Sequence, residues 1–106
     1  MLIATTNEIP GHEIEEVYGE VFGLTVRSRN AFSQIGAGFK SMLGGELKGM
    51  TKALADSRQQ VIDRMVEEAE SKGANAVVAM RFDTSEMGGT WTEICAYGTA
   101  VRIAKT

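Results

Sequence analysis

The sequence is poor in the residues that build metal sites and nucleophilic sites. Among its 106 residues it has one cysteine, Cys95, one histidine, His12, and one proline. A lone cysteine cannot form an internal disulfide, which predicts a reducing compartment, the cytoplasm. Cys-x-x-Cys and His-x-x-His pairs are missing, so the chain lacks the ligand spacing of common structural zinc sites.

Long apolar runs and an excess of basic charge are also missing. No segment approaches the ~20 apolar residues that span a bilayer. Residues 1–6 have neither the basic region nor the apolar length of a signal peptide. The net charge of −3 argues against the concentrated basic face of a nucleic-acid-binding protein. We therefore expect neither a membrane nor a nucleic acid as partner.

What is present is ordinary globular composition, with 43% hydrophobic and 24% charged residues. This excludes intrinsic disorder as the main state and predicts one domain spanning residues 1–106. A chain of this length hides roughly two-thirds of its unfolded surface on folding. A monomer would be modestly stable, and association would help.

The most informative stretch runs from Glu68 to Phe82, where an amphipathic helix ends and a buried strand begins. Gly73 can close the helix in the left-handed conformation, which costs a glycine little. Beyond it the apolar period becomes two, as in a strand. We predict a helix from Thr51 to Lys72 that lies across a sheet, and a strand from Asn75 to about Glu86.

The segment from His12 to Ser28 has the pattern of a long strand with apolar residues on both faces of its second half. Val21 stands on one face, and Phe22 and Leu24 stand on the other. A strand that is apolar on both faces needs two covers, and so short a chain has few elements to supply them. We expect a second subunit to supply one.

Three further elements complete the prediction. Residues 2–6 are a short β-prone run, and residues 30–43 have an apolar stripe typical of a helix. A glycine-bearing turn at residues 87–90 leads into a last strand from Trp91 to Ile103.

Candidate chemistry is sparse, and we predict no catalytic residue. Cys95 lies in an apolar strand pattern, as buried structural cysteines do. His12 and Glu13, with Cys95 in reserve, are the candidate metal ligands. One chain offers too few ligands, but a symmetric ring would multiply each of them. The alternative is that His12 and Glu13 simply begin a solvated acidic strand.

Arg58 falls within the apolar stripe of the second helix, where its N–H donors need partners. Glu46 and Glu93 are candidate partners. Arg58 with Glu46 would form either a clamp for a bound ligand at a subunit interface or a structural tie between subunits, and the tie is favoured.

Six motifs spread over the chain carry a resemblance: Pro10-Gly11-His12-Glu13-Ile14, Gly19-x-Val21-x-Gly23, Gly44-Gly45-Glu46, Ala55-x-x-Arg58, Gly73-Ala74-Asn75-Ala76-Val77 and Glu93-x-x-Ala96-Tyr97-Gly98-Thr99-Ala100-Val101. In this order they resemble the YbjQ-like family, whose label names heavy-metal binding. The resemblance implies an α+β fold, an antiparallel sheet packed by two helices in a dodecin-like β-β-α-α-β-β plan. It also implies a ring-shaped homo-oligomer, a pentamer.

The leading hypothesis is a cytoplasmic, non-enzymatic ring that binds a metal ion or a small ligand at its subunit interfaces. The sequence identifies no cofactor, although a metal ion is compatible with these residues. One alternative is a scaffold oligomer with no ligand. Another is an enzyme with an interfacial site for an anionic substrate, in which Arg58 and Glu46 would act.

Overall fold

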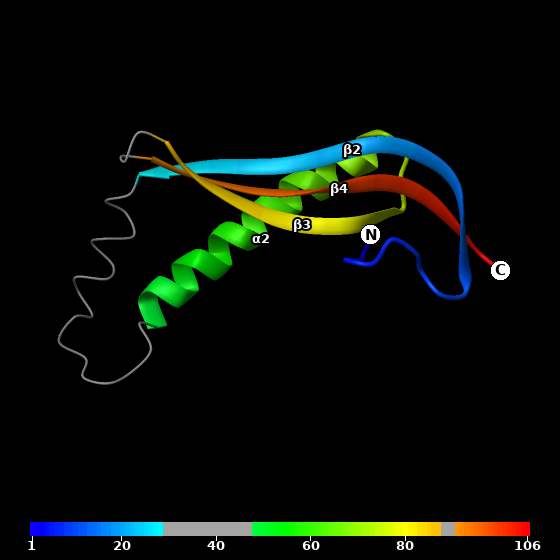
Figure 1. Cartoon of the computed structure of the whole chain (residues 1–106), viewed down its shortest axis with the longest axis horizontal. Coiled ribbons are helices and arrows are strands. Elements are labelled where there is room, and N and C mark those ends of the chain that lie inside the picture. Colours follow the sequence, from blue (N-terminus) through cyan, green and yellow to red (C-terminus); the bar gives the residue numbers. More distant parts are fainter. Residues whose placement is uncertain (29–47, 88–90) are drawn as a thin grey trace.

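A computed structural model describes residues 1–28, 48–87 and 91–106 of the chain. Within them, four strands form one sheet in the order β1-β3-β4-β2, and α2 lies on one face of it (Figure 1). The elements, in chain order, are β1 (Leu2–Ile3), β2 (His12–Ser28), α2 (Lys48–Ser71), β3 (Ala76–Met87) and β4 (Trp91–Lys105).

The predicted two-helix, antiparallel plan is wrong. The described residues contain one helix, and β1 pairs with β3 in parallel, with Leu2 opposite Ala76, so the sheet is mixed. The N–H of Ala4 extends this pairing to the carbonyl of Val77 at 2.9 Å. An apolar alternation marks a strand but carries no information about the direction of its neighbour. The predicted helix at residues 30–43 lies outside the described residues.

The individual elements agree well with their predicted limits. The strand His12–Ser28 is confirmed, and the predicted starts at Asn75 and Trp91 match β3 and β4 to within one residue. The N–H of Gly73 donates to the carbonyl of Glu70 at 3.0 Å, and Gly73 has a φ of 87°. The left-handed glycine therefore ends the helix as predicted.

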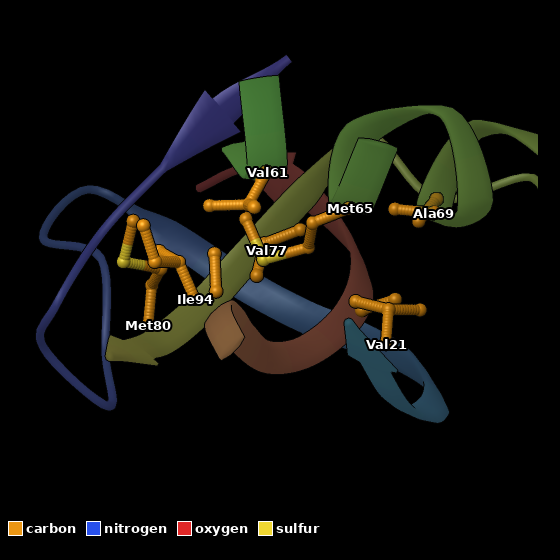
Figure 2. Packing of buried hydrophobic residues seen from close by; sticks show 10 residues of the cluster. Val21, Val61, Met65, Ala69, Val77, Met80 and Ile94 are labelled. Atoms are coloured by element: carbon orange, nitrogen blue, oxygen red, sulfur yellow. The ribbon is translucent and has the colours of Figure 1, made fainter. Parts of the chain in front are cut away.

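The main core lies between α2 and the sheet. Val61, Met65 and Ala69 recur at four-residue steps on one side of α2 and are fully buried. Figure 2 shows them beside Val21 and Val77, which come from the sheet. Removal of this apolar surface from water is the main stabilising contribution to the α2–sheet packing.

A smaller cluster lies apart from this core. Ala76, Val78 and Val101 are buried there with Ile9 and Ile103 packed against them. Arg81 fastens the N-terminal segment by donating from Nη1 to the carbonyl oxygen of Thr5 at 2.8 Å. The segment before β2 therefore covers part of the sheet.

None of the described helical residues forms a segment long and apolar enough to cross a membrane.

Candidate functional site

One apolar surface of the sheet is left uncovered by the described residues. We call it the outer strip, and it consists of Phe22, Leu24, Val26, Cys95 and Tyr97. In β2 the side chains alternate, so Val21 is fully buried whereas Phe22 and Leu24 are 44% and 39% exposed. Phe22 is paired with Tyr97, and Leu24 with Cys95, so the apolar side chains of the two strands are neighbours.

Carboxylates border the outer strip around its thiol. Asp83 is opposite Cys95 in the β3–β4 pairing. Burial raises the pKa of Cys95 above its ordinary value, and the charges of Glu93, Asp83 and Glu20 raise it further. Because the thiolate is the form that attacks electrophiles and binds soft metals, Cys95 has the environment of an unreactive thiol.

The free edge of β2 is closed beside the outer strip. The N–H of Phe22 donates to Glu68 Oε2 at 3.2 Å, and Arg64 Nη1 donates to the carbonyl oxygen of Leu24 at 2.7 Å. Both side chains come from α2 and are four residues apart, so they reach the same side of the helix. The backbone groups at this edge of β2 are therefore hydrogen-bonded, while the apolar side chains of the outer strip remain exposed.

On the other face of the sheet, a pocket of about 300 Å³ lies between the first turns of α2 and the strands. We call it the helix–sheet pocket. Its lining residues are Thr51, Leu54, Ala55, Arg58, Thr84 and Ile94. Thr84 and Ile94 are opposite each other in the β3–β4 pairing. Residues of α2 at steps of three and four complete the lining, because such residues share one side of a helix.

Arg58 has a different environment from the one its position in the stripe suggested. It is exposed, and its guanidinium carbon lies 4.9 Å from the centre of the Phe82 ring, a cation–π contact. Among the described residues, the ion pairs are Lys52–Asp56 and Lys72–Glu68. Glu93 is thus not its ion-pair partner within the chain, and Glu46 lies outside the described residues.

The predicted metal ligands do not come together in one chain. His12 is opposite Lys105, at one end of β4, while Leu24 is opposite Cys95. Ten residues of β4 separate these positions, about 33 Å of extended strand. His12 and Glu13 are exposed at the start of β2, and His12 Nδ1 lies 3.1 Å from the carbonyl oxygen of Pro10.

The described residues contain no group of three or more His, Cys, Asp or Glu side chains that could hold a metal ion. A shallow hollow of about 910 Å³ lies beside His12, lined by residues 6–12 and Ile14. Glu8 and His12 are the ionisable side chains among the described residues that line it. The described part of a single chain therefore does not fit a soft-metal centre.

Sequence reasoning missed Arg64, Glu68, Phe82 and Thr84. Arg64 lies outside the apolar stripe of the helix, so the sequence does not distinguish it from any other solvent-exposed helical residue. The long spacing between Phe82 and Arg58 gives no local signal of their contact. Nothing in the sequence indicated that a cation lies above the Phe82 ring.

In the part of the chain that the structure describes, these features define a small protein with one helix on one face of a mixed sheet, an exposed apolar strip on the sheet and an arginine-bearing pocket beside the helix. The chain matches the YbjQ family model, described as "Putative heavy-metal-binding", over residues 1–104. It belongs to this family.

Close relatives carry names that state no activity. A UPF0145 protein of Acidothermus cellulolyticus is 68% identical over 105 residues, covering 99% of this chain and 97% of the relative. A UPF0145 protein of Streptomyces coelicolor is 59% identical, covering 99% of both chains. A UPF0145 protein of Lactococcus lactis strain MG1363 is 58% identical, covering 99% of this chain and 96% of the relative.

A solved structure supports the fold. A protein of unknown function from Pediococcus pentosaceus, of the DUF74 family, has a TM-score of 0.58 to this chain and covers 98% of both chains. Its sequence is 15% identical, so the likeness concerns the fold alone.

Proposed function

We propose that this protein acts as a ring-forming homo-oligomer, a pentamer, in which the outer strip is covered by a second copy of the chain. The exposure of Phe22, Leu24, Val26 and Tyr97 on one contiguous surface carries the proposal. Apolar patches of this kind commonly mark interaction surfaces.

Two observations favour a second copy as the occupant. The Acidothermus and Streptomyces coelicolor relatives match over 97% and 99% of their own lengths, so those proteins have no additional domain to cover the strip. Arg64 and Glu68 already bond the edge of β2 at the strip. The apolar side chains of the strip are therefore available for packing, whereas the backbone edge of β2 is already bonded. A second copy can pack against these side chains without breaking the hydrogen bonds from Arg64 and Glu68. The subunit number of five comes from the family resemblance.

The ring would bind a metal ion or a small ligand at its subunit interfaces. Because the described residues of one chain do not form a metal site, a metal would need ligands from more than one copy. The raised pKa of Cys95 also means that a metal would have to displace the thiol proton. Such binding would release protons and weaken at low pH.

Native mass spectrometry of protein purified without a metal-affinity tag tests both parts. Five chains of 11.4 kDa give an assembly of about 57 kDa. Elemental analysis of the same sample identifies any metal and gives its number per ring. Wild-type protein that stays monomeric at micromolar concentration would contradict the ring, and an intact ring without additional mass would contradict the ligand.

The variant Leu24→Glu places a charge among the carboxylates that border the strip, and we expect it to abolish assembly while circular dichroism remains native. Gln59→Glu, on an exposed position of α2, is the matched control and should assemble. A ring that survives Leu24→Glu would show that a second copy does not cover the strip.

A further inference from the structure

We propose that the helix–sheet pocket binds a small amphipathic carboxylate, with Arg58 as the residue that recognises the anion. This inference goes beyond the proposed interface ligand, because it places a ligand in a pocket that the described residues of one chain already form. It also does not depend on the ring, since the pocket lies on the helix side of the sheet and the outer strip on the other.

The lining fits a molecule with a hydrocarbon part. Ile94 is 3% exposed and forms part of the main core, whereas Leu54 remains 42% exposed beside it. Ala55 adds a methyl group, and Thr84 adds a methyl group and one hydroxyl. An apolar chain bound here would remove Leu54 from water, and the driving force would be the hydrophobic effect.

The guanidinium of Arg58 is held in an orientation that suits binding of an anion. Its guanidinium lies over the Phe82 ring at 4.9 Å, so the ring holds it through its flat face. Its N–H groups point outward in the plane of the guanidinium. Among the described residues, none accepts a hydrogen bond from these groups or forms an ion pair with them. A planar guanidinium fixed in this way can donate two parallel hydrogen bonds to a carboxylate.

The charge of the site favours a monoanion over a phosphate. Arg58 is the one cationic side chain in the described lining, and Thr84 is one of two hydroxyl residues there. A phosphate dianion usually takes more donors, such as a cluster of backbone N–H groups. Glu86 shares the face of β3 with Phe82, but four residues of strand place it about 13 Å away. Among the described residues, Arg58 and Glu86 form no ion pair.

The volume limits the size of the ligand. At about 30 Å³ per water-sized unit, a pocket of about 300 Å³ holds roughly ten such units. Octanoate, with its eight carbons and two oxygens, is therefore a suitable probe. Octanol has the same chain without the charge, and octylamine reverses the sign.

The test is titration of the full chain with octanoate, followed by calorimetry and by amide chemical shifts in NMR spectra. We expect saturable binding with shifts concentrated on residues 51–58, Thr84 and Ile94. Octanol should bind at least tenfold more weakly, because it cannot accept two charge-assisted hydrogen bonds, and octylamine should not bind at this site.

Three variants make the result specific. Arg58→Gln should weaken octanoate binding at least tenfold while leaving octanol binding unchanged. Arg64→Gln removes a charge from the same helix on the side facing β2, and should bind octanoate as wild type does. Ala55→Phe fills the pocket from an exposed helical position and should abolish binding of both octanoate and octanol.

Equal octanoate binding by wild type and Arg58→Gln would overturn the proposal. So would shifts confined to Phe22, Leu24, Val26 and Tyr97, which would place the octanoate on the outer strip instead. An absence of binding at millimolar octanoate would also overturn it. Native masses recorded on the same samples keep this result separate from the ring, because a monomer that binds octanoate contradicts only the proposed assembly.

Discussion

Gly23 of β2 lies directly against the backbone of α2 at Val61. A Cβ atom at position 23 would overlap the carbonyl oxygen of Val61 and would lie 2.6 Å from the backbone nitrogen of Met65. The helix can approach β2 this closely only because residue 23 has no side chain. The same contact brings Arg64 and Glu68 to the edge of the strand.

Gly23→Ala should therefore destabilise the fold. We expect a loss of about 1–3 kcal/mol in the free energy of unfolding, because the added methyl group must push the helix away. Urea unfolding followed by circular dichroism measures this change. Glu15→Ala, at an exposed position of the same strand, is the control and should change the midpoint little. An unchanged midpoint for Gly23→Ala would mean that α2 packs less closely than described.

Removal of the edge bonds on β2 should promote association of a different kind from the proposed ring. Arg64→Met and Glu68→Met each remove one hydrogen bond, at a net cost of about 1 kcal/mol. They also leave backbone groups of Phe22 and Leu24 open for strand addition. Light scattering at rising concentration should show open-ended aggregates in the double variant. Glu67→Met, exposed on the same helix, is the control, and equal scattering by both would refute an edge-protecting role.

The thiol of Cys95 should react slowly at neutral pH. Its pKa is raised by burial and then by Glu93, Asp83 and Glu20, so little thiolate is present. Alkylation by iodoacetamide should be slower than for a free thiol and should accelerate at alkaline pH. Glu93→Gln removes a negative neighbour, lowers the pKa and should increase the rate at pH 8. Glu70→Gln, on α2, is the control. A rate unaffected by Glu93→Gln would contradict the contribution of the Glu93 charge to the raised pKa of Cys95.

The same raised pKa makes stability depend on pH. The folded chain holds the Cys95 proton more tightly than the unfolded chain, so this contribution is fully present below the ordinary thiol pKa. It is lost as pH rises through the higher pKa of the folded state. Cys95→Ala should therefore lose less stability than wild type when the pH is raised from 8 to 10. Parallel urea titrations at these two pH values measure the difference.

Asn75 should be sensitive to replacement although it is exposed. Its side-chain amide donates to the carbonyl of Ile103 at 2.9 Å and accepts from the N–H of Ile103 at 2.7 Å. Asn75→Ala should cost about 1–2 kcal/mol, since two hydrogen bonds are lost. Asn75→Asp keeps the acceptor but places a carboxylate against the Ile103 carbonyl. Its deficit in urea unfolding should shrink on acidification, because a protonated carboxyl can donate again. A deficit independent of pH would contradict this pairing.

The local elements were predictable because their signals are local. The alternation from His12 to Ser28 marked β2 correctly, and Gly73 marked the end of the helix to within two residues. The sheet topology was not predictable in this way. The pairing of Leu2 with Ala76 joins residues far apart in the sequence, and both parallel and antiparallel neighbours satisfy the same alternation.

The candidate site shows the same division. The sequence showed that Arg58 breaks an apolar stripe and that β2 is apolar on both faces. It did not show that Arg58 lies over Phe82, nor that His12 and Cys95 are separated by most of β4. Such relations depend on the register of strands and on the angle of the helix, which long-range packing decides.

The sequence by itself thus determined where most strands and α2 begin and end, because period, glycine stops and turns act over a few residues. Only the tertiary structure decided which face of β2 enters the core. Val21 and Phe22 are both apolar, and the close approach of α2 at Gly23 buries the first and leaves the second exposed. That choice creates the outer strip, and with it the surface proposed to join the subunits.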